Sequence, residues 1–181
     1  KLNSMLRSEN DEIKKQILLL AYEKNNFIDK DLLLNLSKQD DQIGAIAVSL
    51  FDKSTITKYL NELSDQLFST SPHKIASTAV AILKHDPEHI KAKVILNNFL
   101  DIKDESTTAI ALDYLKNSTS LLPEKTLIEL LNHKSTTISK SALNVAGNRL
   151  HTDYIPAIIS NLENIKCAQN ARNILKLYNQ E

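Results

Sequence analysis

An alanine recurs at nearly constant intervals along this chain, and this spacing constrains the fold more than any other feature of the sequence. The five alanines are separated by 29 to 32 residues, and each opens a short segment of aliphatic side chains; they are Ala47, Ala79, Ala111, Ala142 and Ala171. A sixth copy without the alanine begins at Gln16. A repeat of this length is typical of helix pairs that bury their apolar faces only against neighbouring pairs.

Each alanine follows an apolar or small residue by four positions, which places the two on the same face of a helix. These anchor positions are Ile43, Ile75, Thr107, Ile138 and Cys167. A small side chain at the middle of such a stripe lets another helix approach closely. Between successive copies lies a second amphipathic helix, for example at 126–131. The sequence therefore predicts a series of helix pairs in which all five alanines are buried.

The chain contains two glycines and four prolines, so it offers few residues for β-hairpin turns and is predicted to be all-α. Ser71-Pro72 and Asp86-Pro87 each have the pattern of an N-cap followed by proline at the first helical position. Ser54, Asp104, Ser135 and Thr152 are further cap candidates. The expected helices are 9–24, 29–37, 40–52, 55–68, 72–84, 87–100, 104–116, 123–132, 136–149, 153–162 and 165–178.

Two neighbouring segments resemble the two helices of a HEAT repeat. Residues 154–162 match the first helix, with its proline and its Leu/Ile spacing, and residues 138–150 match the second, with Ala142 and a late Gly147. The resemblance implies a right-handed α-solenoid of about five stacked antiparallel helix pairs, a HEAT-like or ARM-type superhelix. It also implies that Gly147 serves close helix packing. We expect 1–181 to be one HEAT-like repeat domain, excised from a longer chain.

The sequence departs from the family at the position after each anchor. There the family often carries an arginine or lysine, whereas this chain has only small residues: Gly44, Ala76, Thr108, Ser139 and Ala168. We expect tighter packing between neighbouring pairs to replace the missing charged ladder.

Composition argues against several functions. The 22 basic residues balance the 22 acidic ones and tryptophan is absent, which disfavours a nucleic-acid binder. No segment is apolar enough to span a bilayer, so no membrane insertion of this segment is expected. The single cysteine, Cys167, allows no intramolecular disulfide and fits a cytoplasmic protein.

Two groups of residues suggest chemistry, but each has a simpler interpretation. The segment His85–His89 has histidines spaced like those of some zinc helices, although Asp86-Pro87 predicts a helix start between them. Cys167 is a possible nucleophile, but it occupies an anchor position and is more simply a buried hydrophobic residue. We therefore expect no catalytic, metal-binding or cofactor-binding residues, and no cofactor.

The exposed side of the later second helices is rich in amides and lysines. Its members are Lys140, Asn144, Asn148, Gln169, Asn173 and Lys176. In HEAT-type stacks the second helices line the concave side, so these residues are the candidate site for a protein or peptide partner. The alternative is that they form a solvated face, as most charged stretches do.

Three functions remain open. The first is a non-catalytic scaffold for protein–protein interaction, which the extended surface of stacked helix pairs favours. The second is a soluble regulatory domain of a larger membrane protein, such as a relative of nucleotide transporters. The third is a HEAT-like DNA-repair glycosylase, which the balanced charge and the lack of tryptophan disfavour.

Overall fold

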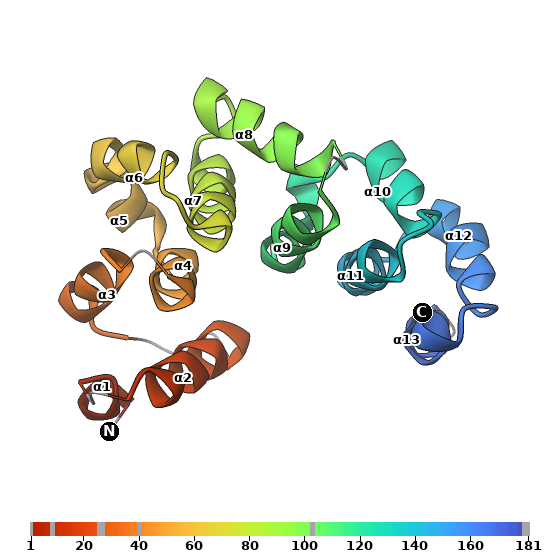
Figure 1. The fold of residues 1–181 in the computed structure, drawn as a ribbon, viewed down its shortest axis with the longest axis horizontal. Coiled ribbons are helices and arrows are strands. Elements are labelled where there is room, and N and C mark those ends of the chain that lie inside the picture. Colours follow the sequence, from red (N-terminus) through yellow and green to blue (C-terminus); the bar gives the residue numbers. More distant parts are fainter. Residues whose placement is uncertain (1, 8–9, 25–27, 40, 102–103, 179–181) are drawn as a thin grey trace. The chain divides into compact units, whose positions relative to one another are not determined.

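The computed structural model describes residues 2–7, 10–24, 28–39, 41–101 and 104–178 (Figure 1). Throughout this part of the chain the secondary structure is helical and no strand occurs, so the prediction of an all-α protein is confirmed. The chain forms two compact units, Lys1–Asn98 and Phe99–Glu181. Each unit is described by itself. None of the described helices combines the length and the apolarity that crossing a membrane requires.

In the first unit, one helix of each pair packs on the corresponding helix of the next pair. Helix α4 contacts both α2 and α7, while α3 covers α4, and α5 and α6 cover α7. The bounds are α1 Leu2–Met5, α2 Asp11–Lys24, α3 Lys30–Ser37, α4 Gln42–Ser49, α5 Lys53–Lys58, α6 Leu60–Gln66, α7 Pro72–His85 and α8 Ile90–Leu100, the last of which crosses the boundary between the units.

The second unit repeats this arrangement. Helix α11 packs between α9 and α13, α10 covers α11, and α12 contacts both α10 and α13 (Figure 1). The α-helices are α9 Glu105–Leu115, α10 Glu124–Leu131, α11 Thr136–Gly147, α12 Ile155–Ser160 and α13 Ile165–Leu177, with short 3-10 helices η1 Thr119–Leu121 and η2 Thr152–Tyr154. In the sequence, α9, α11 and α13 are the helices that carry the repeated alanine.

The repeated alanines are the best predicted part of the core. All five are fully buried, with an exposed fraction of 0% each. The anchors are less uniform: Ile43, Ile138 and Cys167 are buried, but Ile75 and Thr107 are only half-buried. The position after each anchor is buried in every copy instead. The buried stripe of these helices is thus centred on the small residues and lies one position later than the anchors.

Both described glycines lie where a Cβ atom would meet another part of the chain. A Cβ atom on Gly147, the last residue of α11, would lie 3.2 Å from Cγ1 of Ile174 on α13. A Cβ atom on Gly44 in α4 would collide with the backbone carbonyl of Gln39. The interpretation of Gly147 as a close-packing residue near a helix end is therefore confirmed.

A buried lysine, which the sequence did not predict, holds two helices of the first unit together. Lys74 of α7 is 2% exposed, and its ammonium group donates hydrogen bonds to the carbonyl oxygens of Ser37 and Gln39 at the end of α3. The last carbonyls of a helix lack intrahelical donors and carry partial negative charge. The buried ammonium satisfies two carbonyls at this helix end and ties α7 to α3.

The expected boundaries fail at three caps. Thr152 is the first residue of η2 rather than a cap, and His151 caps that helix. Asp52 rather than Ser54 caps α5. The predicted helix 55–68 is two helices, because the backbone leaves helical geometry at Tyr59. The predicted helix 87–100 begins only at Ile90, and the ring nitrogen Nδ1 of His89 accepts a hydrogen bond from the backbone N–H of Ala92. In contrast, Ser71, Asp104 and Ser135 cap α7, α9 and α11 as predicted.

Candidate interaction face on helices α11 and α13

The candidate face is built on two helices that pack directly on each other. Ser135 caps α11, and Asn164 caps α13 by accepting a hydrogen bond from the backbone N–H of Lys166. Ala142 and Ala171 are buried in the two helices and add little bulk to their packing. The apolar sides face inward, and therefore the polar residues on the opposite sides of α11 and α13 form one exposed surface.

All six predicted face residues are exposed. Lys140, Asn144 and Asn148 follow one another at intervals of four along α11, so they lie on one side of that helix. On α13, Gln169 and Asn173 have the same spacing, and the side-chain amide of Gln169 donates to Oδ1 of Asn173 over 3.1 Å. Each of these residues is exposed, whereas their joint role as a binding surface stays a prediction.

Asn170 belongs to this surface, although the sequence analysis omitted it. Its side-chain amide donates to Oδ1 of Asn144 over 3.4 Å and so links α13 to α11. The sequence contained a signal for it, because Asn170 lies four residues after Lys166 and three before Asn173 on the same helix. We refer to Lys140, Asn144, Asn148, Gln169, Asn170, Asn173 and Lys176 as the amide face.

Asn148 has a structural contact in addition to its exposure. Its side-chain amide donates to the carbonyl oxygen of Lys116 over 2.8 Å, at the C-terminal end of α9. This bond satisfies a terminal helix carbonyl and joins α11 to α9. Asn148 therefore has one of its two amide N–H donors already used within the chain, and the other amides of the face are better placed for a partner.

Every charged side chain on the two helices of the face is positive. Helices α11 and α13 together carry four cations and no carboxylate: Lys140, Lys166, Arg172 and Lys176. All four are exposed. The face therefore attracts acidic groups although the chain as a whole has no net charge. Each asparagine and glutamine amide offers both donors and an acceptor, which matches the N–H and C=O groups of a peptide backbone.

Cys167 lies beneath this face and is fully buried. Its sulfur is 3.5 Å from the hydroxyl oxygen of Ser139 and 3.9 Å from the carbonyl oxygen of Thr136, both on α11. The thiol thus fills a helix contact, as the sequence predicted, and the geometry offers no open path to a substrate.

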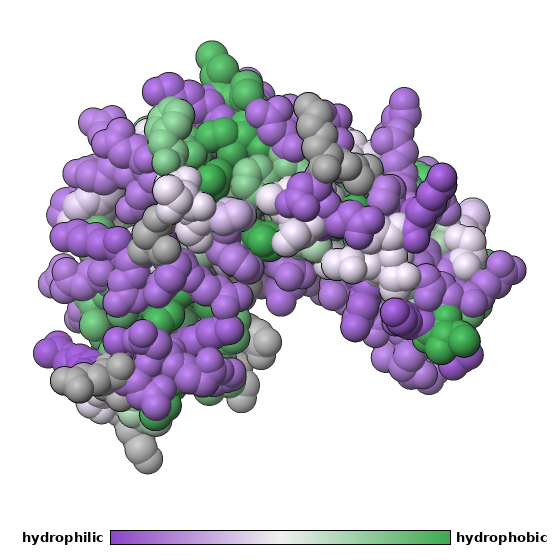
Figure 2. Space-filling view, in the orientation of Figure 1, coloured by the Kyte–Doolittle hydropathy of each residue, from purple (hydrophilic) through white to green (hydrophobic). Residues whose placement is uncertain are grey.

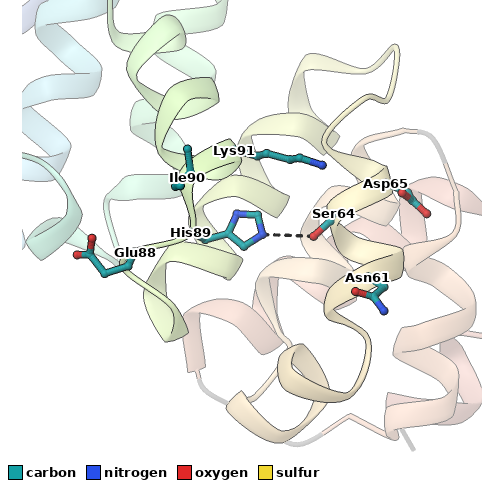
Figure 3. A pocket seen from close by; sticks show the side chains of 7 residues that line it. All are labelled: Asn61, Ser64, Asp65, Glu88, His89, Ile90 and Lys91. Carbon is teal, nitrogen blue, oxygen red and sulfur yellow. Dashed lines mark hydrogen bonds between the residues drawn. The ribbon is translucent and has the colours of Figure 1, made fainter.

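The segment His85–His89 does not bring its side chains together. His85 is the last residue of α7, and burial together with Lys84 and Lys53 lowers its pKa. Both ring nitrogens of His89 are engaged: Nδ1 accepts from the backbone N–H of Ala92, and Nε2 lies 3.4 Å from the hydroxyl oxygen of Ser64 (Figure 3). The hydroxyl of Ser64 in turn donates to the carbonyl oxygen of Leu60.

These contacts decide whether Ser64 and His89 form a nucleophile and its base. Because Nδ1 accepts a hydrogen bond, the neutral ring carries its proton on Nε2, which then donates to Ser64. A general base must instead accept the hydroxyl proton. The pair is therefore arranged as a structural contact between α6 and the start of α8.

A second cluster that the sequence analysis missed surrounds Arg149. Donor atoms of Glu124, His151 and Asp153 lie within 4.8 Å of one another. The guanidinium group of Arg149 binds the same Glu124 carboxylate at 2.7 Å and also donates to two backbone carbonyls, those of Thr119 and Leu122. The positive charge of the Arg149 guanidinium group disfavours a metal ion beside Glu124. We interpret the cluster as a hydrogen-bonding network that joins the end of α11 to η1 and to the start of α10.

Comparison with known proteins adds little. No protein-family model matches the chain, and no curated protein is similar to it in sequence. A crystal structure of an engineered protein from the Northeast Structural Genomics Consortium matches with 16% identity, a TM-score of 0.43, and coverage of 97% of this chain and 96% of that one. At this level the likeness carries no argument about fold or function.

Proposed function

We propose that the chain is a non-catalytic α-solenoid scaffold of the HEAT type that binds a protein or peptide partner on the amide face. The observation that carries the proposal is the coincidence of amides and cations on two adjacent helices that lack any carboxylate. Neither helix propensity nor core packing requires these residues, because asparagine is a poor helix former and the side chains are exposed.

The contacts within each unit support the solenoid part of the proposal. In both units the alanine-bearing helices pack on one another in sequence order, and the intervening helices form a second layer. The burial of the alanine in all five copies supports a single repeated packing position. Such stacks present long surfaces suited to extended partners.

Two further aspects complete the proposal. We propose that the chain has no enzymatic activity, since Cys167 is buried and the Ser64–His89 contact has the wrong proton arrangement for catalysis. We also propose a cytoplasmic location, which the single cysteine fits. An acidic peptide segment is the expected partner, because lysines steer acidic groups and the amides can then pair with its backbone.

The test is affinity capture with quantitative mass spectrometry, using the intact chain and two variants. The first variant combines Lys140→Glu, Asn144→Glu and Asn173→Glu on the amide face. The control combines Lys125→Glu, Asn97→Glu and Asn117→Glu, which are exposed elsewhere and change the charge by the same amount. The partner should be lost from the first variant and retained by the control. Equal recovery from both, with the fold verified by circular dichroism, would exclude the amide face as the site.

A further inference from the structure

A pocket in the first unit is lined by polar and charged side chains together with the apolar Ile90. It has a volume of 570 Å³ and lies between α6 and the start of α8 (Figure 3). Asn61, Ser64 and Asp65 form one wall, and the segment 88–91 forms the other. The contact between Ser64 and His89 uses the hydrogen-bonding groups of both side chains. What remains available to a ligand is therefore the rest of the lining.

Large apolar side chains are exposed on the two helices that form the pocket; Ile90 belongs to its lining, whereas Phe68 and Val94 lie outside the lining. Ile90 is 77% exposed and Phe68, just after α6, is 70% exposed. Val94 follows Ile90 by one helical turn and is also exposed, so the two extend one apolar stripe along α8. Figure 2 shows apolar surface over α8. Exposed aliphatic and aromatic side chains gathered beside a pocket mark an interaction site more often than scattered single ones do.

The α6 wall of the pocket carries one carboxylate, that of Asp65, and Glu62 lies three residues before it outside the lining. Helix α6 carries Glu62 and Asp65, both exposed, and no cation. Within the described residues, neither carboxylate has an ion-pair or hydrogen-bond partner. On the opposite wall, the carboxylate of Glu88 is already paired with Lys93 at 2.9 Å.

Lys91 is the remaining cation of the lining. Its ammonium group lies 5.8 Å from the centre of the Phe68 ring, which is within the range of a cation–π contact. Because Lys91 lies at the Phe68 ring and forms no ion pair among the described residues, the carboxylates of α6 remain available to a cationic group.

We propose that this pocket binds peptide segments in which an aliphatic residue is followed by a basic one. The aliphatic side chain packs on Phe68, Ile90 and Val94, and the lysine or arginine pairs with Asp65 and Glu62. The pocket lies in the first unit and prefers a basic ligand, whereas the amide face lies in the second and prefers an acidic one. The two binding proposals are therefore independent, and either can fail alone.

The test uses three synthetic, fluorescently labelled peptides of about ten residues, the length of an extended segment that spans a few side-chain pockets. The first contains repeated Leu-Arg pairs separated by Gly and Ser. The second replaces each arginine with glutamate, and the third replaces each leucine with serine. We expect the first peptide to bind at least about tenfold more tightly than either of the others, since both kinds of contact contribute. Its affinity should fall as salt rises, because the carboxylates are exposed.

Variants and chemical-shift mapping locate the binding. Asp65→Lys and Ile90→Ser should each weaken binding of the Leu-Arg peptide at least about tenfold. Glu163→Lys, an exposed control in the second unit with the same charge change as Asp65→Lys, should leave binding unchanged. In spectra of the nitrogen-15-labelled chain, the peptide should shift the amide signals of Ser64, Ile90 and Lys91.

Three results would overturn the proposal. One is equal affinity for the Leu-Arg and Leu-Glu peptides, and another is the absence of measurable binding at millimolar peptide. The third is a set of shifted signals confined to α11 and α13, which would assign the peptide to the amide face instead.

Discussion

Replacing Ala142 with leucine tests the packing of the second unit most directly. Ala142 lies in α11, which packs between α9 and α13, and none of its surface is exposed. Leucine adds three carbon atoms to the side chain at a position without free space. The helix itself should tolerate the change, because leucine is nearly as good a helix former as alanine.

The size of the effect follows from two opposing contributions. Burying three more carbons would stabilise the fold by roughly 2.4 kcal/mol if the site had room for them, at about 0.8 kcal/mol for each carbon. A filled site must instead displace α9 or α13 or accept strained rotamers, and overpacking of this kind has a net cost of about 1–3 kcal/mol. For a chain of this length, that cost corresponds to a fall in Tm of about 2–12 °C.

The measurement is urea unfolding followed by circular dichroism at 222 nm, together with thermal melting. Asn144→Leu is the matched control, because it introduces the same side chain two residues along the same helix at an exposed position. It should change the free energy of unfolding by less than about 0.5 kcal/mol. Ala79→Leu in α7 should cost as much as Ala142→Leu if the two positions are equivalent in the repeat. The packing argument is refuted if Ala142→Leu is as stable as the parent chain, or if Asn144→Leu is destabilised equally.

Three further predictions concern single side chains. Cys167 should react with a thiol reagent at least about a hundredfold more slowly in the native chain than in urea, because labelling requires local opening; equal rates would mean that the thiol is accessible. Lys74→Met should lower the free energy of unfolding by about 1–3 kcal/mol, since two carbonyls at the end of α3 lose their donor, whereas Lys84→Met at an exposed position should be neutral. The hydrogen bond from Lys30, with others from Thr55 and Ser54, holds the pKa of Asp52 far below its ordinary value of 3.8. Its stabilising contribution is therefore present above about pH 4 and is lost as the pH falls below the pKa of the unfolded chain. An Asp52→Asn variant, compared with the parent by urea unfolding across this range, should show a shallower loss of stability in acid; an unchanged acid profile would show that Asp52 contributes little.

The periodic pattern could be predicted because small side chains recur at the same helix position. An alanine at the same helix position in every copy is a local signal, and each of the five is buried as expected. The anchors vary more in burial for a related reason. Four-residue spacing defines a side of a helix only to within part of a turn, and Ile75 and Thr107 lie at the margin of the buried stripe rather than in it. The neighbouring small residues gave the better signal, since close helix packing selects for them.

The contacts of long polar side chains could not be predicted, because they depend on which helix ends meet. Nothing in the residues around Lys74 shows that its ammonium group reaches carbonyls more than thirty positions earlier in the chain. The same holds for Arg149, which donates to backbone carbonyls 27 and 30 residues away. Both contacts follow from the pairing of helices, and that pairing is known only when the fold is known.

The two proposed binding surfaces differ in how far they can be predicted from the sequence. The amide face consists of residues at helical spacing on two of the helices that carry the recurring alanine. The sequence therefore indicated all of its residues except Asn170. The pocket between α6 and α8 joins the end of one helix to a turn that the sequence placed inside a helix. Three of its lining residues carry no helical periodicity, because Glu88 and His89 precede α8 and Ile90 is its first residue. The connections between helices carry the weakest periodic signal in a helical chain, so a binding site built there is harder to predict from the sequence than one built on a helix face.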